Sequence, residues 1–128
     1  MKKNRFAFEN LDVWQKAMDF AVEVTNISEN INTDRKHFRL VEQLESAAAS
    51  VVANIAEGKG RYSKKEFLKF LYIARGSLYE TITFLMLFNR KKWICDTDLE
   101  KASDLAEEIN KMVSGLINAI KRSLRESE

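Results

Sequence analysis

The chain has 128 residues and a formal net charge of only +2, so it fits a single domain and is not a polycation. Hydrophobic residues make up 45% of the sequence and charged residues 31%, a balance typical of globular proteins with a buried core. With no proline and only four glycines, the composition favours long uninterrupted helices, and the single cysteine excludes an internal disulfide.

The sequence also bears on the cellular location. No apolar run reaches the ~18 residues that a membrane-spanning helix needs. The basic first five residues lead into a charged amphipathic stretch and not into the apolar centre of a signal peptide. Because a lone cysteine also fits a reducing compartment, we expect a cytoplasmic protein.

The first predicted helix runs from about Leu11 to Asn30, with the Asn10 side chain capping its first free amides. Apolar residues recur along it in steps of three and four, which places them on one face. This core face consists of Val13, Trp14, Ala17, Phe20, Ala21, Val24 and Ile27.

The second predicted helix covers about residues 35–57, with Thr33 or Asp34 as its cap. Its core face begins at Phe38, and its later turns are rich in alanine. Such small side chains let a neighbouring helix approach closely. Gly58 and Gly60 are predicted to end this helix, because glycine accepts the left-handed conformation common at helix ends.

The third and fourth predicted helices cover about residues 64–92 and 98–125. Ser63 with Glu66, and Thr97 with Glu100, have the spacing of capping boxes. The fourth helix starts with acidic residues and ends with basic ones, an order that complements the helix dipole. The basic ones are Lys121, Arg122 and Arg125. Four helices with short connections predict an all-α, antiparallel up-down four-helix bundle.

The third helix is apolar around most of its circumference between Phe67 and Phe88. A bundle helix needs an apolar stripe of only about three positions in seven. Since a four-helix protomer leaves one side of each helix in water, we expect a second buried interface with another copy of the chain. The alternative is an unusually deep position of this helix under a loop or a terminus.

Few residues are suited to catalysis. His37 is the single histidine, and we interpret it as a solvated or core-edge residue near a helix start. Cys95 follows Trp93 and Ile94, and we interpret it as a buried structural thiol. No Glu-x-x-His pair of the kind used by di-iron bundles is present. We therefore expect no enzymatic activity, no metal and no cofactor.

A basic cluster lies at the junction of the second and third helices. It consists of Lys59, Arg61, Lys64, Lys65 and Lys69, with Tyr62 among them and Tyr72 following at helical spacing. Lysine and arginine neutralise phosphates, aromatic rings stack on bases, and the free amides at a helix start favour anions. Two interpretations remain open: a nucleic-acid-binding site, or a solvated charged corner of the bundle.

Asn54, Glu57 and Gly58 precede this cluster. Asn54 is flanked by Ala53 and Ile55, so it is expected to be partly buried and to need a hydrogen-bond partner. We interpret Asn54 and Glu57 as structural residues that bond to a neighbouring helix or cap and fix the turn at Gly58. A ligand contact is the other interpretation.

Three segments carry a resemblance to known proteins: Phe8–Ala17, Ser50–Arg61 and Glu66–Glu80. Together they resemble the family of four-helix bundle proteins encoded within intervening sequences of bacterial 23S ribosomal RNA genes, also labelled as ribosomal S23 proteins. The family often has proline where this chain has Val52, so the second helix should be straighter here.

The resemblance implies an antiparallel four-helix protomer and a ring-like homopentamer. It also implies similarity to the accessory variability determinant protein of diversity-generating retroelements, a basic pentameric barrel that binds nucleic acid and a reverse transcriptase. The fold alone does not fix the function, however.

Our leading hypothesis is a non-enzymatic, oligomeric protein that contacts the backbone of RNA or DNA through the basic cluster. Tyr62 or Tyr72 would be stacking groups. The alternative is a protein-interaction scaffold without nucleic-acid affinity, which uses the apolar third helix and the acidic start of the fourth. That acidic segment contains Asp96, Asp98, Glu100, Asp104, Glu107 and Glu108.

Overall fold

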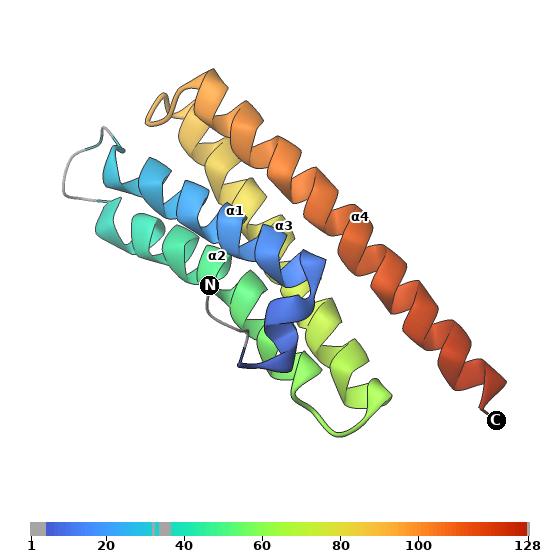
Figure 1. Cartoon of the computed structure of the whole chain (residues 1–128). Coiled ribbons are helices and arrows are strands. Elements are labelled where there is room, and N and C mark those ends of the chain that lie inside the picture. Colours follow the sequence, from blue (N-terminus) through green and yellow to red (C-terminus); the bar gives the residue numbers. More distant parts are fainter. Residues whose placement is uncertain (1–4, 32, 34–36, 128) are drawn as a thin grey trace.

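The computed structural model describes residues 5–31, 33 and 37–127. A short 3-10 turn, η1 (Ala7–Asn10), precedes four helices: α1 (Asp12–Glu29), α2 (Phe38–Lys59), α3 (Lys64–Arg90) and α4 (Asp96–Glu126). Each helix runs opposite to the one before it, and α4 returns to pack beside α1 (Figure 1). The predicted all-α class is confirmed, with no strand in the described ranges.

The core is built from one face of each helix, as the periodicity predicts. Among the largest fully buried side chains are Phe20 of α1, Leu44 of α2, Phe88 of α3 and Ile109 of α4. Phe38, however, was wrongly predicted to belong to this core, since 66% of it is exposed. It is the first residue of α2, and full burial on that helix begins only at Leu44. None of the helices, as far as they are described, is long and apolar enough to cross a membrane.

The most extensive helix contact joins α2 and α3. At its tightest point Gly58 faces the side chains of Phe67 and Phe70. A Cβ atom added to Gly58 would lie 2.6 Å from the Cβ of Phe70 and 3.0 Å from Cδ1 of Phe67. Glycine is therefore needed at position 58 because the two helices approach closely there. It is not needed for its conformational freedom, because its backbone is helical and its φ is not positive.

One predicted cap is confirmed and two are wrong. The Ser63 hydroxyl accepts a hydrogen bond from the Glu66 amide at the start of α3. Asn10 does not cap α1, because it belongs to η1 and the extended residue before α1 is Leu11. Thr97 lies inside α4, which begins two residues earlier than predicted, after Cys95.

The start of α2 also differs from the prediction. This helix begins at Phe38, its N-cap residue His37 makes no capping side-chain bond, and of the two predicted caps Asp34 lies outside the described residues. The predicted left-handed glycine at its end is wrong as well. Gly60 follows α2 with φ −79°, and Lys92, after the end of α3, has the positive φ of 63°.

One side of α3 stays uncovered in the single chain. Its buried residues include Leu71, Leu78 and Leu85, which point into the bundle. The opposite side, here called the outer face of α3, is exposed over four turns. It consists of Tyr72, Ile73, Gly76, Tyr79, Glu80, Thr83, Met86 and Leu87. The excess of apolar residues that the sequence shows is therefore not absorbed by the protomer's own core.

The substitution Gly58→Ala tests the close approach of α2 and α3. Its methyl group would overlap the Cβ of Phe70, so the α3 backbone has to move, and we expect a loss of about 1–3 kcal/mol in the free energy of unfolding. Gly115→Ala is the matched control, because a Cβ there meets open space. We expect this variant to be more stable by ~1 kcal/mol, since alanine has the higher helix propensity. Urea unfolding followed by circular dichroism measures both, and equal stabilisation of the two variants would contradict the contact.

Candidate functional site

The basic cluster is positioned by the turn between α2 and α3. Gly60 closes the end of α2 by donating its amide to the carbonyl of Ala56, and Ser63 opens α3 by accepting the amide of Glu66 at 3.1 Å. The Phe67 amide donates to the Ser63 carbonyl as well. These capping bonds fix where α2 ends and α3 begins, so the cations of the turn are held at one corner of the bundle.

Two cations of the cluster rest on aromatic rings. The ammonium group of Lys59 lies 5.9 Å from the centre of the Phe67 ring, and the guanidinium of Arg61 lies 4.8 Å from that of Phe70. Arg61 also forms an ion pair of 2.8 Å with Glu57. The rings that pack against Gly58 therefore also orient these two cations, and the charge of Arg61 is partly compensated.

Three cations of the cluster extend from the first turns of α3. Lys64 donates a hydrogen bond to the hydroxyl of Ser123, near the end of α4. Lys65 and Lys69 are exposed, lie four residues apart on the same side of α3 and form no ion pair with any described residue. These two like charges, without a counter-charge, are the part of the cluster most open to an anion.

The two predicted stacking residues lie in different surroundings. Tyr62 sits in the turn, is fully exposed and has no ring contact within the described structure. Tyr72 lies on the outer face of α3, where the guanidinium of Arg75 is 5.2 Å from its ring centre. Only Tyr62 is therefore placed among the cations of the turn.

The structure separates the roles of Asn54 and Glu57. The Asn54 amide bonds within its own helix, to the carbonyl and the hydroxyl of Ser50 at 2.7 and 2.8 Å. Ser50 then bonds across to the hydroxyl of Ser77 on α3 at 2.9 Å. The predicted link to a neighbouring helix thus runs through Ser50, while Glu57 braces the turn through Arg61.

A further basic segment joins this end of the bundle. It comprises Lys121, Arg122 and Arg125, which are all exposed. From the sequence we explained these residues by the helix dipole alone. The bond from Lys64 to Ser123 shows that the end of α4 lies beside the start of α3. The predicted up-down topology already implied this proximity, because the fourth helix of such a bundle ends beside the turn between the second and third helices.

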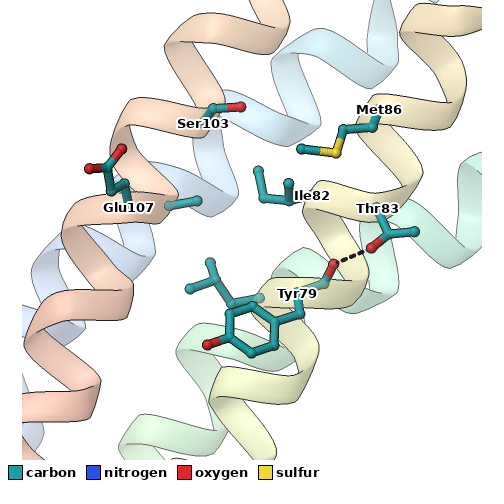
Figure 2. A pocket seen from close by; sticks show the side chains of 8 residues that line it. Tyr79, Ile82, Thr83, Met86, Ser103 and Glu107 are labelled. Carbon is teal, nitrogen blue, oxygen red and sulfur yellow. Dashed lines mark hydrogen bonds between the residues drawn. The ribbon is translucent and has the colours of Figure 1, made fainter.

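A groove of about 370 Å³ opens between α3 and α4, farther along the outer face of α3. Figure 2 shows the residues that line it, with Tyr79, Ile82, Thr83 and Met86 on α3 and Ser103 and Glu107 on α4. The Thr83 hydroxyl is already bonded to the Tyr79 carbonyl. The groove is therefore an apolar surface with a polar rim.

The residues considered for catalysis lie apart from the basic cluster. His37 is half-buried before α2, with its ring 4.4 Å from that of Trp93, which confirms its interpretation as a core-edge residue. Cys95 is exposed, so its interpretation as a buried thiol is wrong. It is the residue just before α4, outside the packed part of that helix. Over the described ranges, no three His, Cys, Asp or Glu residues are grouped to hold a metal ion.

Comparison with known proteins finds similarity both to a sequence family and to a solved structure. Residues 9–115 match the 23S rRNA-intervening sequence protein family. The fold is similar to the crystal structure of a protein of unknown function from the S23 ribosomal protein family of Bacteroides thetaiotaomicron. The TM-score is 0.76 at 30% identity, over 82% of this chain and 97% of the other. A comparison with curated proteins finds no match.

The substitution Ser63→Ala tests the cap that holds the basic turn. It removes the acceptor of the Glu66 amide without changing any charge, and we expect a loss of about 1 kcal/mol in the free energy of unfolding. Thr97→Ala is the control, since Thr97 lies inside α4 and not at its cap. Thermal unfolding compares the two, and the cap assignment fails if Ser63→Ala is no less stable than the control.

Proposed function

Because the chain belongs to the 23S rRNA-intervening sequence protein family, we propose that it is a non-enzymatic, homo-oligomeric protein that binds the backbone of RNA or DNA. The observation that carries the proposal is the basic cluster, in which five cations share one corner of the bundle. A protein of net charge +2 has no overall attraction to a polyanion, so binding has to come from such a local surface.

The electrostatics of the corner favour a ligand with several phosphates. Glu57 is already paired with Arg61, which leaves Lys65 and Lys69 uncompensated on adjacent turns. Phosphates would relieve their mutual repulsion and release counterions. The first free amides of α3 add to the positive potential at the same place. The chain has no motif that reads base edges, so this binding is largely independent of sequence.

The outer face of α3 supports self-association. Between Tyr72 and Leu87 it carries several large exposed apolar side chains and the charge of Glu80, while the guanidinium of Arg75 lies beside the Tyr72 ring. Gly76 lies in the middle of this face, although glycine costs a helix ~1 kcal/mol. A Cβ added to it would meet open space, so packing within the protomer does not require glycine there. A partner helix from another copy would explain both features, since glycine permits close approach of backbones.

Self-association would also enlarge the basic surface. Lys65 and Lys69 continue the outer face of α3 toward its start, so copies that join through this face would bring their uncompensated lysines together. Five copies in a ring is the arrangement that the family resemblance implies, and we propose this number. We also propose a cytoplasmic location, as the lone cysteine suggests.

The alternative function, a protein-interaction scaffold, is supported by the apolar groove between α3 and α4. Exposed apolar grooves bind amphipathic helices of other proteins, and Glu107 at the rim would favour a basic partner. A protein partner that remains bound after nuclease treatment, together with no affinity for nucleic acid, would favour this alternative.

Neutralising Lys65 and Lys69 together with Lys59, which forms no ion pair with a described residue, tests the nucleic-acid proposal. We expect the triple variant Lys59→Gln, Lys65→Gln, Lys69→Gln to weaken binding to labelled duplex DNA. The salt slope should become shallower by ~0.9 for each phosphate that the variant no longer neutralises. Fluorescence anisotropy across a salt series measures this slope.

The matched control removes three positive charges elsewhere: Arg39→Gln, Arg90→Gln and Lys91→Gln, all exposed, away from the turn and without an ion pair to a described residue. Its slope should equal that of the parent protein. Equal salt slopes for the two triple variants would show that the basic cluster does not bind nucleic acid.

Gly76→Glu tests self-association through the outer face of α3. A carboxylate in the middle of an apolar interface is desolvated without a partner, so we expect the oligomer to dissociate into folded protomers. Gly115→Glu is the matched control, a second exposed helical glycine with open space around it. Light scattering after size exclusion gives the mass of each, and an unchanged oligomer in Gly76→Glu would rule out this interface.

A further inference from the structure

The end of α4 and the start of α3 form one surface, as three cross-helix hydrogen bonds show. Tyr79 donates to Asn110 at 3.0 Å and Arg75 donates to Ser114 at 3.1 Å, while Lys64 donates to Ser123 near the ends of the helices. Moving four residues back along α3 thus corresponds to moving four residues forward along α4. The bond of Lys64 lies eleven residues farther back along α3 and nine farther forward along α4, so the two helices remain side by side up to this end.

Cations of both helices lie at the end of this seam between α3 and α4. Lys121 and Arg125 each lie two residues from Ser123, the partner of Lys64, so they are near this bond along α4 but project from the other side of that helix. Lys65 precedes Tyr79 by fourteen residues, about four turns, so it lies on the side of α3 that carries Tyr79. All three side chains are exposed and form no ion pair with a described residue.

We propose that this seam is the second half of the nucleic-acid site and that its ligand is a single strand. The phosphates of the strand run from Lys65 across to Lys121 and Arg125. The inference rests on the proposed function but concerns α4 residues that lie beyond the segment matching the family, which ends at residue 115.

The exposed ring of Tyr62 is the reason why we propose a single-stranded ligand. Its ring is fully exposed, touches no other ring in the described structure, and lies two residues before Lys64, which bonds to the end of α4. An aromatic ring stacks on the face of a base, and that face is open only when the base is unpaired. In a duplex the same ring would meet only the backbone. Tyr62 therefore selects for unpaired nucleotides, while the cations bind the backbone of any nucleic acid.

The α4 half of the site is tested with the full chain and short labelled single strands of RNA and DNA. We expect Lys121→Gln combined with Arg125→Gln to reduce the salt slope by about 1.4, from ~0.7 for each contact on a single strand. Arg90→Gln with Lys91→Gln removes the same charge at the opposite end of the bundle and should leave the slope unchanged. Equal slopes for the two double variants would overturn the α4 contribution.

The choice of ligand is tested with Tyr62→Ala and Tyr62→Phe against single strands and a duplex of the same sequence. Tyr62→Ala should lose about fivefold or more in affinity for the single strands, with the salt slope and the duplex affinity unchanged. Tyr62→Phe keeps the ring and should bind like the parent protein. An unchanged affinity of Tyr62→Ala for single strands, or an equal loss on the duplex, would overturn the single-strand assignment.

Two outcomes distinguish a failure of the seam from a failure of nucleic-acid binding as a whole. If the cluster variant binds more weakly while the α4 variants do not, nucleic-acid binding stands and the seam is wrong. If the parent protein binds no strand even at low salt, both are wrong. The substituted positions are exposed, so we expect each variant to fold like the parent protein. Circular dichroism of each variant checks this.

Discussion

The close approach of α2 to α3 at Gly58 is the constraint on which the rest of the structure depends. With no side chain at Gly58, the rings of Phe67 and Phe70 fit against the end of α2. The same rings lie under Lys59 and Arg61, so one contact both packs the two helices and orients two cations. Farther along the pair, the bond between Ser50 and Ser77 is a polar link within the interface. The basic turn is thus a consequence of how tightly these helices meet.

Burial of one side of α3 determines what its other side presents. The helix directs Leu71, Leu78 and Leu85 into the core, which leaves Tyr79 and Met86 about half exposed on the outside. An apolar face of this length is unfavourable in water, so a partner that covers it stabilises the protein. Because Lys65 and Lys69 extend the same side of the helix, self-association and binding of a polyanion are physically linked in our proposal.

Much of the architecture could be predicted from local patterns, while several details could not. The periodicity of α1 identified its buried residues, and the spacing of Ser63 and Glu66 identified a real cap. The similar spacing of Thr97 and Glu100 did not, because α4 begins earlier, after Cys95. A capping residue must be extended and precede the first helical turn, and side-chain spacing alone does not show where that turn begins.

The sequence by itself determined the helical class, the four segments, the excess of apolar residues on α3 and the presence of a basic cluster. These follow from periodicity and composition, which are local properties of the chain. Only the tertiary structure decided that Lys121 and Arg125 lie at the same end of the bundle as Lys65, and that Arg61 is partly neutralised. It also decided that the Tyr72 ring lies beside the Arg75 guanidinium, whereas the Tyr62 ring has no such contact with a described residue. Such relations depend on the register and rotation of packed helices, and these are set by contacts between residues far apart in the sequence.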